Sequence, residues 1–259
     1  MLFLAMLAML AADAPRRLDN PAYVPSSLVN AASSESGAVA PNTIVTLYGQ
    51  GLAYGVRALR DSDIRANQLP TVLTGSGVRV YVANMPAAIY YVSPTQVNLL
   101  LPADLPAGPA RLRLALDGRS GPEVPIVLRP AAPALFQMEG RVAIATRPDG
   151  SLITAERRAR PGETIVLYAT GLGELSPPLP PGQLARTAAW IARAGEFRLW
   201  IDGASVPREA ILYAGAAPGF AGLYQINLVL PSLVGARPTI RIAVGDDASP
   251  ADVVVEAAP

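Results

Sequence analysis

Apolar and polar residues alternate along two nearly identical stretches of this chain. Residues 96–102 read Gln-Val-Asn-Leu-Leu-Leu-Pro, and residues 225–231 read Gln-Ile-Asn-Leu-Val-Leu-Pro. A period of two predicts a β-strand with one buried face. The proline after each stretch ends the strand, because proline cannot donate to a β-ladder. The same strand is therefore written twice, which predicts a tandem repeat.

The sequence around this strand also matches between the two copies. Residues 41–52 correspond to residues 161–172, and Gly51 and Gly171 predict the turn that ends each stretch, because glycine tolerates positive φ. Alternating apolar residues predict strands at 78–82, 87–92, 112–116 and 124–129, and the second copy answers them at 197–201, 206–213, 240–244 and 252–256. Turns at Asn84 and at Asp202-Gly203 predict that the strands at 87–92 and 206–213 pair back.

The segments that differ most between the copies are 53–77 and 174–196, and we interpret them as loops. A short run around Trp190 and Ile191 is interpreted as one or two helical turns. Residues 134–154 predict an additional hairpin before the second copy, with its turn at Pro148-Asp149-Gly150-Ser151.

Each copy has the size and strand number of an immunoglobulin-like β-sandwich, and the 26 Pro and 22 Gly of the chain fit many turns. The predicted fold class is therefore all-β, with two tandem immunoglobulin-like β-sandwich domains. Pro130-Ala131-Ala132-Pro133 predicts a short, stiff boundary. The first domain is expected to cover residues 15–130, and the second, with its additional hairpin, residues 131–259.

The N-terminus is apolar from Met1 to Ala12, and Asp13 is the first charged residue. This run is too short to span a bilayer as a helix, but it suits a signal peptide over residues 1–14. A secreted, cell-surface or periplasmic protein is therefore expected. The alternatives are a misassigned start and a membrane-anchored N-terminus. No other stretch is long and apolar enough to cross a membrane.

Charge and residue usage remove several classes of function. The net charge of +1 gives no electrostatic basis for binding nucleic acid. The chain has no Cys, which excludes disulfides and Cys-ligated metals. It also has no His, which excludes the Ser-His-Asp triad and imidazole ligands. We therefore expect a protein that is not an enzyme and needs no cofactor.

Several motifs together resemble one family, the Solibacter-type C-terminal domain of secreted acidobacterial proteins, which is uncharacterised. The resemblance covers roughly residues 25–256 and is carried by 30–33, 40–52, 91–98, 161–163, 168–173 and 218–225. The half-repeats also look like IPT/TIG domains, a branch of the immunoglobulin-like fold. The resemblance implies this fold and export, and it implies no catalytic residues.

Acidic and basic clusters offer little chemistry. Asp61-Ser62-Asp63 and Asp246-Asp247 carry oxygen ligands suited to Ca²⁺, but neither has the spacing of an EF-hand loop, so solvated turn carboxylates are the simpler interpretation. Residues 156–160 form a basic cluster that we interpret as a solvated linker face rather than an anion site. A carboxylate pair for glycoside hydrolysis cannot be assigned among 20 scattered acidic residues.

The repeated amides allow two interpretations. Gln96 and Asn98 share one strand face, as do Gln225 and Asn227. They either form a polar ligand surface or bond neighbouring backbone as partly buried amides must. Their occurrence in both copies favours the structural interpretation, since a unique site needs only one copy.

The second copy has a longer loop before its Gln-x-Asn strand, including Pro218-Gly219-Phe220-Ala221-Gly222. Candidate ligand-binding residues near it are Trp200, Tyr213, Phe220 and Tyr224, because aromatic rings stack on sugars or fill a partner's pocket. The alternative is that Phe220 caps the sandwich.

The resulting hypothesis is an exported, non-catalytic interaction or structural module that acts through loops and strand edges. Its partner would be a protein or a cell-surface polysaccharide, and a pocket at the domain interface is a favoured ligand location. The alternatives are a carbohydrate-binding module that uses loop aromatics and a hydrolase with an acidic residue pair.

Overall fold

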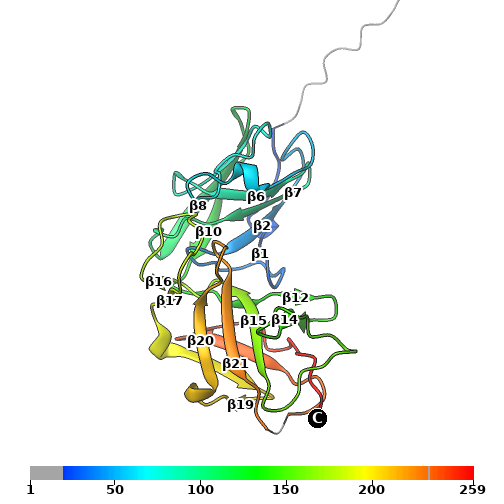
Figure 1. The fold of residues 1–259 in the computed structure, drawn as a ribbon. Coiled ribbons are helices and arrows are strands. Elements are labelled where there is room, and N and C mark those ends of the chain that lie inside the picture. The colour runs from blue at the N-terminus through cyan, green and yellow to red at the C-terminus, as the bar shows by residue number, and fades with distance from the viewer. Residues whose placement is uncertain (1–19, 233) are drawn as a thin grey trace, which may run out of the picture.

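The computed structural model describes residues 20–232 and 234–259, so the predicted signal peptide at 1–14 lies outside the described residues. The protein is all-β, with antiparallel sheets and only single turns of 3-10 helix. Two β-sandwiches lie one above the other in Figure 1, the N-terminal one blue to green and the C-terminal one green to red. The predicted fold class, tandem immunoglobulin-like sandwiches, is confirmed.

The N-terminal sandwich consists of two five-stranded sheets. The first has the order β1-β2-β7-β6-β3, with β1 (Leu28–Asn30), β2 (Ile44–Tyr48), β3 (Arg57–Ala58), β6 (Ala88–Val92) and β7 (Gln96–Leu100). The second has the order β10-β8-β4-β5, with β4 (Val78–Val82), β5 (Met85–Pro86), β8 (Gly108–Leu116), β9 (Arg119–Ser120), which pairs with β8, and β10 (Val124–Leu128). Two 3-10 turns, η1 (Pro25–Ser27) and η2 (Asp61–Asp63), lie in its loops.

The C-terminal sandwich repeats this plan with a wider first sheet. That sheet has the order β11-β15-β21-β20-β17-β16, with β11 (Ala134–Leu135), β14 (Ala145–Thr146), which pairs with β15, β15 (Thr164–Thr170), β16 (Leu175–Ser176), β17 (Trp190–Ile191), β20 (Ile211–Ala216) and β21 (Tyr224–Val229). The opposite sheet has the order β19-β18-β22-β23, with β18 (Phe197–Ile201), β19 (Ala204–Ser205), β22 (Ile240–Val244) and β23 (Asp247–Ala248). The remaining elements are the hairpin β12 (Gln137–Met138) and β13 (Val142–Ala143), and the turns η3 (Ala194–Glu196) and η4 (Arg208–Ala210).

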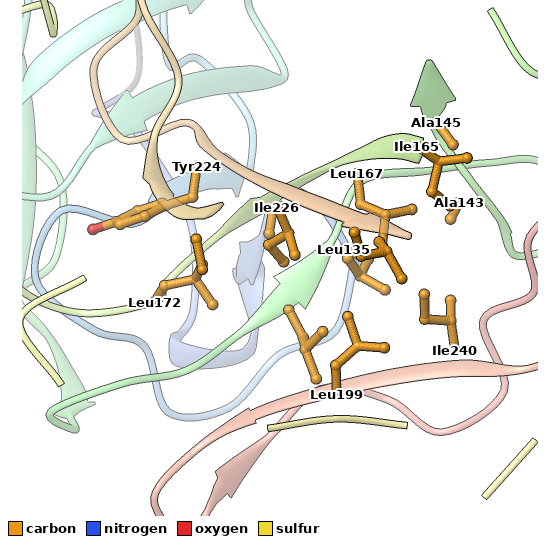
Figure 2. Packing of buried hydrophobic residues seen from close by; sticks show 14 of the residues in the cluster. Leu135, Ala143, Ala145, Ile165, Leu167, Leu172, Leu199, Tyr224, Ile226 and Ile240 are labelled. Atoms are coloured by element: carbon orange, nitrogen blue, oxygen red, sulfur yellow. The ribbon is translucent and has the colours of Figure 1, made fainter. Parts of the chain in front are cut away.

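The repeated strand lies at the centre of each first sheet. β7 lies between β2 and β6, and β21 lies between β15 and β20. The aliphatic residues on either side of its asparagine point into the core: Val97 and Leu99 in one copy, and Ile226 and Leu228 in the other, are fully buried. Figure 2 shows Ile226 and Leu167 in the C-terminal core, with Leu199 and Ile240 from the opposite sheet. Alternation along one strand thus separates a dry interior from an outer face.

Three details differ from the sequence-based predictions. The segments 87–92 and 206–213 pair back only at their first residues, where the backbone N–H groups of Ala87 and Val206 bond the carbonyls of Val80 and Leu199. The chain then crosses to the other sheet, where β6 pairs with β7 and β20 with β21. The run at Trp190 and Ile191 is a short strand, β17, and not a helical turn. The segment 252–256 forms only isolated bridges, such as that between Val254 and Thr239, rather than a continuous strand.

The two sandwiches share a small apolar core of their own. Loops of the C-terminal sandwich cover the lower part of the outer face of the first sheet, where Ile44, Ala88 and Leu100 are outward-facing neighbours. Leu184 and Ala221 supply the covering side chains. The segment 217–222, which follows β20, therefore serves mainly as a contact between sandwiches.

Hydrogen bonds reinforce this apolar contact. The Tyr90 hydroxyl donates to the carbonyl oxygen of Ala221 (2.5 Å), and the Thr170 hydroxyl donates to that of Gly222 (2.8 Å). Thr170 Oγ1 also accepts from the backbone N–H of Ile44 (2.9 Å). Because these groups come from both halves of the chain and are withdrawn from water, the interface holds the sandwiches in one orientation.

Two glycines in the covering segment allow a matched test of this interface. Gly219 and Gly222 both have positive φ (81° and 66°), so alanine carries a similar backbone cost of ~1–2 kcal/mol at each. A Cβ on Gly222 would overlap Cδ1 of buried Leu100, whereas a Cβ on Gly219 meets no atom. Gly222→Ala should therefore lower the unfolding free energy, measured by urea titration, clearly more than Gly219→Ala; equal losses would contradict this packing.

The buried phenol of Tyr90 should make the unfolding free energy fall at alkaline pH. Burial raises its pKa, outweighing the hydrogen bond to Ala221, so the folded state keeps the phenol proton above pH 10.0, where the unfolded chain loses it. The stabilisation is complete below about pH 10 and is lost as the pH rises above that value. In urea titrations from pH 8 to 11, Tyr90→Phe should show a shallower loss than the wild type. Parallel profiles would contradict this assignment.

Candidate functional site

The outer face of the first sheet of the C-terminal sandwich gathers five uncharged side chains. These residues, here called the aromatic–amide face, are Tyr168, Trp190, Tyr213, Gln225 and Asn227. Register places Tyr168 opposite Gln225, Gln225 opposite Gly215, and Gly215 opposite Trp190. Asn227 lies opposite Tyr213 in the neighbouring row. Four adjacent strands thus present one continuous surface.

The open end of this face is an aromatic pair. The rings of Trp190 and Tyr213 meet edge to face, with centroids 4.7 Å apart and an interplanar angle of 61°. Trp190 remains 46% exposed, although tryptophan usually buries most of its surface. The Tyr213 ring lies over Gly215, where any Cβ would overlap it. The glycine therefore lets the Tyr213 ring lie close to the sheet beside the half-exposed Trp190.

The two amides bond each other along β21. Nε2 of Gln225 donates to Oδ1 of Asn227 (3.3 Å). This differs from the expectation that the repeated amides bond neighbouring backbone. Within residues 20–232 and 234–259, no protein group bonds Oε1 of Gln225 or Nδ2 of Asn227. An acceptor and a donor therefore lie side by side on a half-exposed surface.

The hydroxyl of Tyr213 is held by the backbone. It lies 3.1 Å from the carbonyl oxygen of Ala189 and 3.0 Å from that of Ala216, so its proton points inward and its lone pairs stay available. Burial raises the pKa of Tyr213 more than the bond to Ala189 lowers it, which keeps the phenol neutral. At the other end, the hydroxyls of Tyr168 and Thr146 share a hydrogen bond of 3.1 Å.

The residues predicted from the sequence lie in different places. Tyr213 belongs to the face just described. Trp200 is on β18, opposite Arg241, and faces outward from the other side of the sandwich. Phe220 is 54% exposed in the covering segment, so it does not cap the sandwich.

Tyr224 is withdrawn from the surface. Its side chain is fully buried in the C-terminal core (Figure 2), and its hydroxyl donates to Gly173 and accepts from Nδ2 of Asn42 across the domain interface. Burial raises its pKa. The structure therefore brings together only Tyr213 and the Gln225/Asn227 pair, and Trp190 replaces the other three aromatic candidates.

A cavity of about 280 Å³ lies between the sandwiches. Asn42 and Asp104 line it from the N-terminal side, and Glu174 and Leu179 from the C-terminal side. Two acidic residues therefore line this cavity, at the interface where a ligand was expected. Its volume is below the range of ~300–1,000 Å³ typical of small-molecule pockets.

Each charged cluster identified in the sequence analysis has at least one member in a structural contact. Asp63 accepts from Arg57 (2.8 Å) and from the backbone N–H of Arg60. Asp247 pairs with Arg129 (2.7 Å), and Arg158 pairs with Glu256 (3.5 Å). In the part of the chain that the structure describes, no group of three or more acidic residues could hold a metal ion.

Comparison with known proteins yields distant similarities in structure only. No family model and no curated protein matches the chain. The surface glycan-binding protein PbSGBP-B of Prevotella bryantii is 10% identical over 89% of this chain and 41% of that one, with a TM-score of 0.27. Domains 5–6 of the S-layer protein SbsC are 10% identical over 93% of this chain and 100% of that one, with a TM-score of 0.28.

A Bacteroides ovatus surface glycan-binding protein, solved with a mixed-linkage heptasaccharide, is 13% identical over 85% of this chain and 42% of that one, with a TM-score of 0.34. The chain thus spans less than half the length of the two glycan-binding proteins. Similarities this distant do not bear on the ligand. No helix among the described residues has the length and apolar character needed to cross a bilayer.

Proposed function

We propose that the protein is an exported, non-catalytic module that binds a neutral polysaccharide on the aromatic–amide face. The observation that carries this proposal is the half-exposed Trp190–Tyr213 pair beside two amides with unused hydrogen-bonding groups. The export expected from the N-terminal apolar run is part of the proposal, because extracellular polysaccharide would be met outside the cell.

The chemistry of the face matches a sugar chain. Aromatic rings offer apolar area with little loss of conformational freedom, and sugar rings present C–H groups that pack on it. Adjacent sugar hydroxyls both donate and accept, which suits Oε1 of Gln225 beside Nδ2 of Asn227. None of the five side chains is charged, so the face offers no ion pair to an anionic ligand.

The edges of the sheet that carries this face suit an added strand poorly. The first sheet of the C-terminal sandwich ends in β16, with two residues, and in β11 and β14, with two residues each. An added strand needs a longer row of free backbone groups, and short edges are a common protection against it. We therefore favour the face over the edges that the sequence suggested.

Removing either aromatic ring should weaken binding. Trp190→Ala or Tyr213→Ala should each cost about 2 kcal/mol, or ~30-fold in affinity, because stacked rings dominate such contacts. Phe220→Ala is the matched control, since Phe220 is 54% exposed, against 46% for Trp190, but lies in the covering segment. Affinity electrophoresis in gels of neutral β-glucan, xylan or mannan would measure the effect. Loss of binding in Phe220→Ala alone would favour the loop hypothesis instead.

The amide contribution can be tested separately. Asn227→Asp keeps the shape of the side chain but removes both N–H donors, so binding should weaken about tenfold, roughly one hydrogen bond. Equal urea unfolding midpoints of the wild type and Asn227→Asp would show that the sheet is intact. Unchanged affinity would mean that the amides serve the sheet alone.

Hydrolysis is a separate outcome of the same experiments. Release of reducing ends from a bound polysaccharide would overturn the non-catalytic part of the proposal. Asp104→Asn and Glu174→Gln would then test the interface cavity as its source.

A further inference from the structure

The N-terminal sandwich carries a second copy of the same outer face. Tyr48 lies opposite Gln96, as Tyr168 lies opposite Gln225. Asn98 lies opposite Tyr91, as Asn227 lies opposite Tyr213. Both tyrosines follow a break in register, between Ile89 and Tyr91 in β6 and between Ile211 and Tyr213 in β20. The four pairs of residues therefore correspond in strand, register and local geometry.

The hydrogen bonding of the amides is repeated as well. Nε2 of Gln96 donates to Oδ1 of Asn98 (2.8 Å), and Thr46 donates to the same oxygen (3.1 Å). Across the described residues, Oε1 of Gln96 and Nδ2 of Asn98 bond no protein group. The same acceptor and donor are thus left free in both sandwiches.

This face is open to solvent. The loops of the C-terminal sandwich cover Ile44, Ala88 and Leu100, one row below the amides. Beyond that row Tyr48 is 45% exposed, and Gln96, Asn98 and Tyr91 are half-buried. Core packing explains the repeated inward residues, and strand register requires only that the outward positions be polar. Neither selects amides and tyrosines in particular. The sequence alone favoured a structural role for the repeated amides, but their unbonded groups on an open face favour a shared ligand chemistry.

Two elements of the face are not repeated. Ser93 lies opposite Gln96, as Gly215 lies opposite Gln225, and it carries a Cβ where the glycine leaves space for the tyrosine ring. The second missing element is the tryptophan. β3 pairs Arg57 with Val92 and Ala58 with Tyr91. Extending that register by one residue places Val56 opposite Ser93, the position that Trp190 holds opposite Gly215. Val56 is 71% exposed, so a larger side chain has room there. The N-terminal face therefore has the tyrosines and amides but lacks the glycine and the tryptophan.

We infer that the protein binds its neutral polysaccharide at two corresponding faces, one on each sandwich, with the N-terminal face the weaker. This inference rests on the proposed function. Because the interface fixes the sandwiches relative to each other, a polymer that reaches both faces gains affinity through effective concentration. A short oligosaccharide engages one face at a time.

The first test uses cellohexaose, xylohexaose and mannohexaose as probes in isothermal titration calorimetry. The wild type should show a strong and a weak site for one of them. Trp190→Ala combined with Tyr213→Ala should leave the weak site, and adding Tyr91→Ala should remove it. If no hexasaccharide or parent polysaccharide binds the wild type, the proposed function is wrong. If the wild type has a single binding site and the double variant abolishes it, only the two-face inference is wrong.

Val56→Trp is a gain-of-function test that does not depend on loss of folding. In the Trp190→Ala, Tyr213→Ala background, it should strengthen the residual site about tenfold or more, because it supplies the missing ring. Val127→Trp is the control, since Val127 is also exposed but lies on β10 in the other sheet. An equal effect of both substitutions, or none from Val56→Trp, would overturn the assignment of the N-terminal face.

Discussion

The pairing of β7 with β2, and of β21 with β15, is the contact on which both sandwiches depend. Each central strand places alternate aliphatic side chains in a core without water. Because successive side chains point to opposite faces, the intervening residues lie on the outer face. A shift of one residue would bury the amides of Gln96 and Asn98 without partners. The polar residues thus fix the register by the cost of burying them, and the same requirement keeps them available to a ligand.

The contact between the sandwiches uses the sheet of the N-terminal sandwich that contains β2 and β7. The outer face of that sheet has an apolar row, which loops of the C-terminal sandwich cover, and a polar row that stays open to solvent. Hydrogen bonds from Tyr90 and Thr170 supply polar partners inside the seam. Because the covering segment lies between β20 and β21, the strands that carry Tyr213 and Gln225 also position the interface. The proposed binding face and the domain interface therefore share structural elements.

Much of this architecture could be predicted from local pattern. The inward positions of β4, β8, β18 and β22, the turn glycines and the repeated central strand all follow from a period of two and from backbone preferences. The amides were placed correctly on one strand face. Their partners were not, because a hydrogen bond between Gln225 and Asn227 rather than to backbone depends on side-chain rotamers.

The missed elements share a physical cause. β17 is two residues long and has no alternation of its own; pairing with Gly215 across a long loop makes it a strand, and with it Trp190 joins the site. Likewise, the sequence analysis interpreted the segment 218–222 as a loop whose aromatic ring binds a ligand. In the structure its small residues, Ala221 and Gly222, contact the N-terminal sandwich. Non-local partners decided both cases. One available signal was Gly215 itself, a glycine inside an apolar strand that often marks close approach by another group.

The interface between the sandwiches is asymmetric. The N-terminal sheet contributes Ile44 and Leu100 to its apolar core, and the corresponding positions on the C-terminal sheet are Thr164 and Val229. A loop like 217–222 would meet a more polar surface on the C-terminal sheet. The terminal repeats of a solenoid likewise present a hydrophilic outer surface. The head-to-tail contact between the two sandwiches is therefore not encoded equally in both sheets, because Thr164 places a hydroxyl where Ile44 supplies an aliphatic side chain, while Val229 remains apolar.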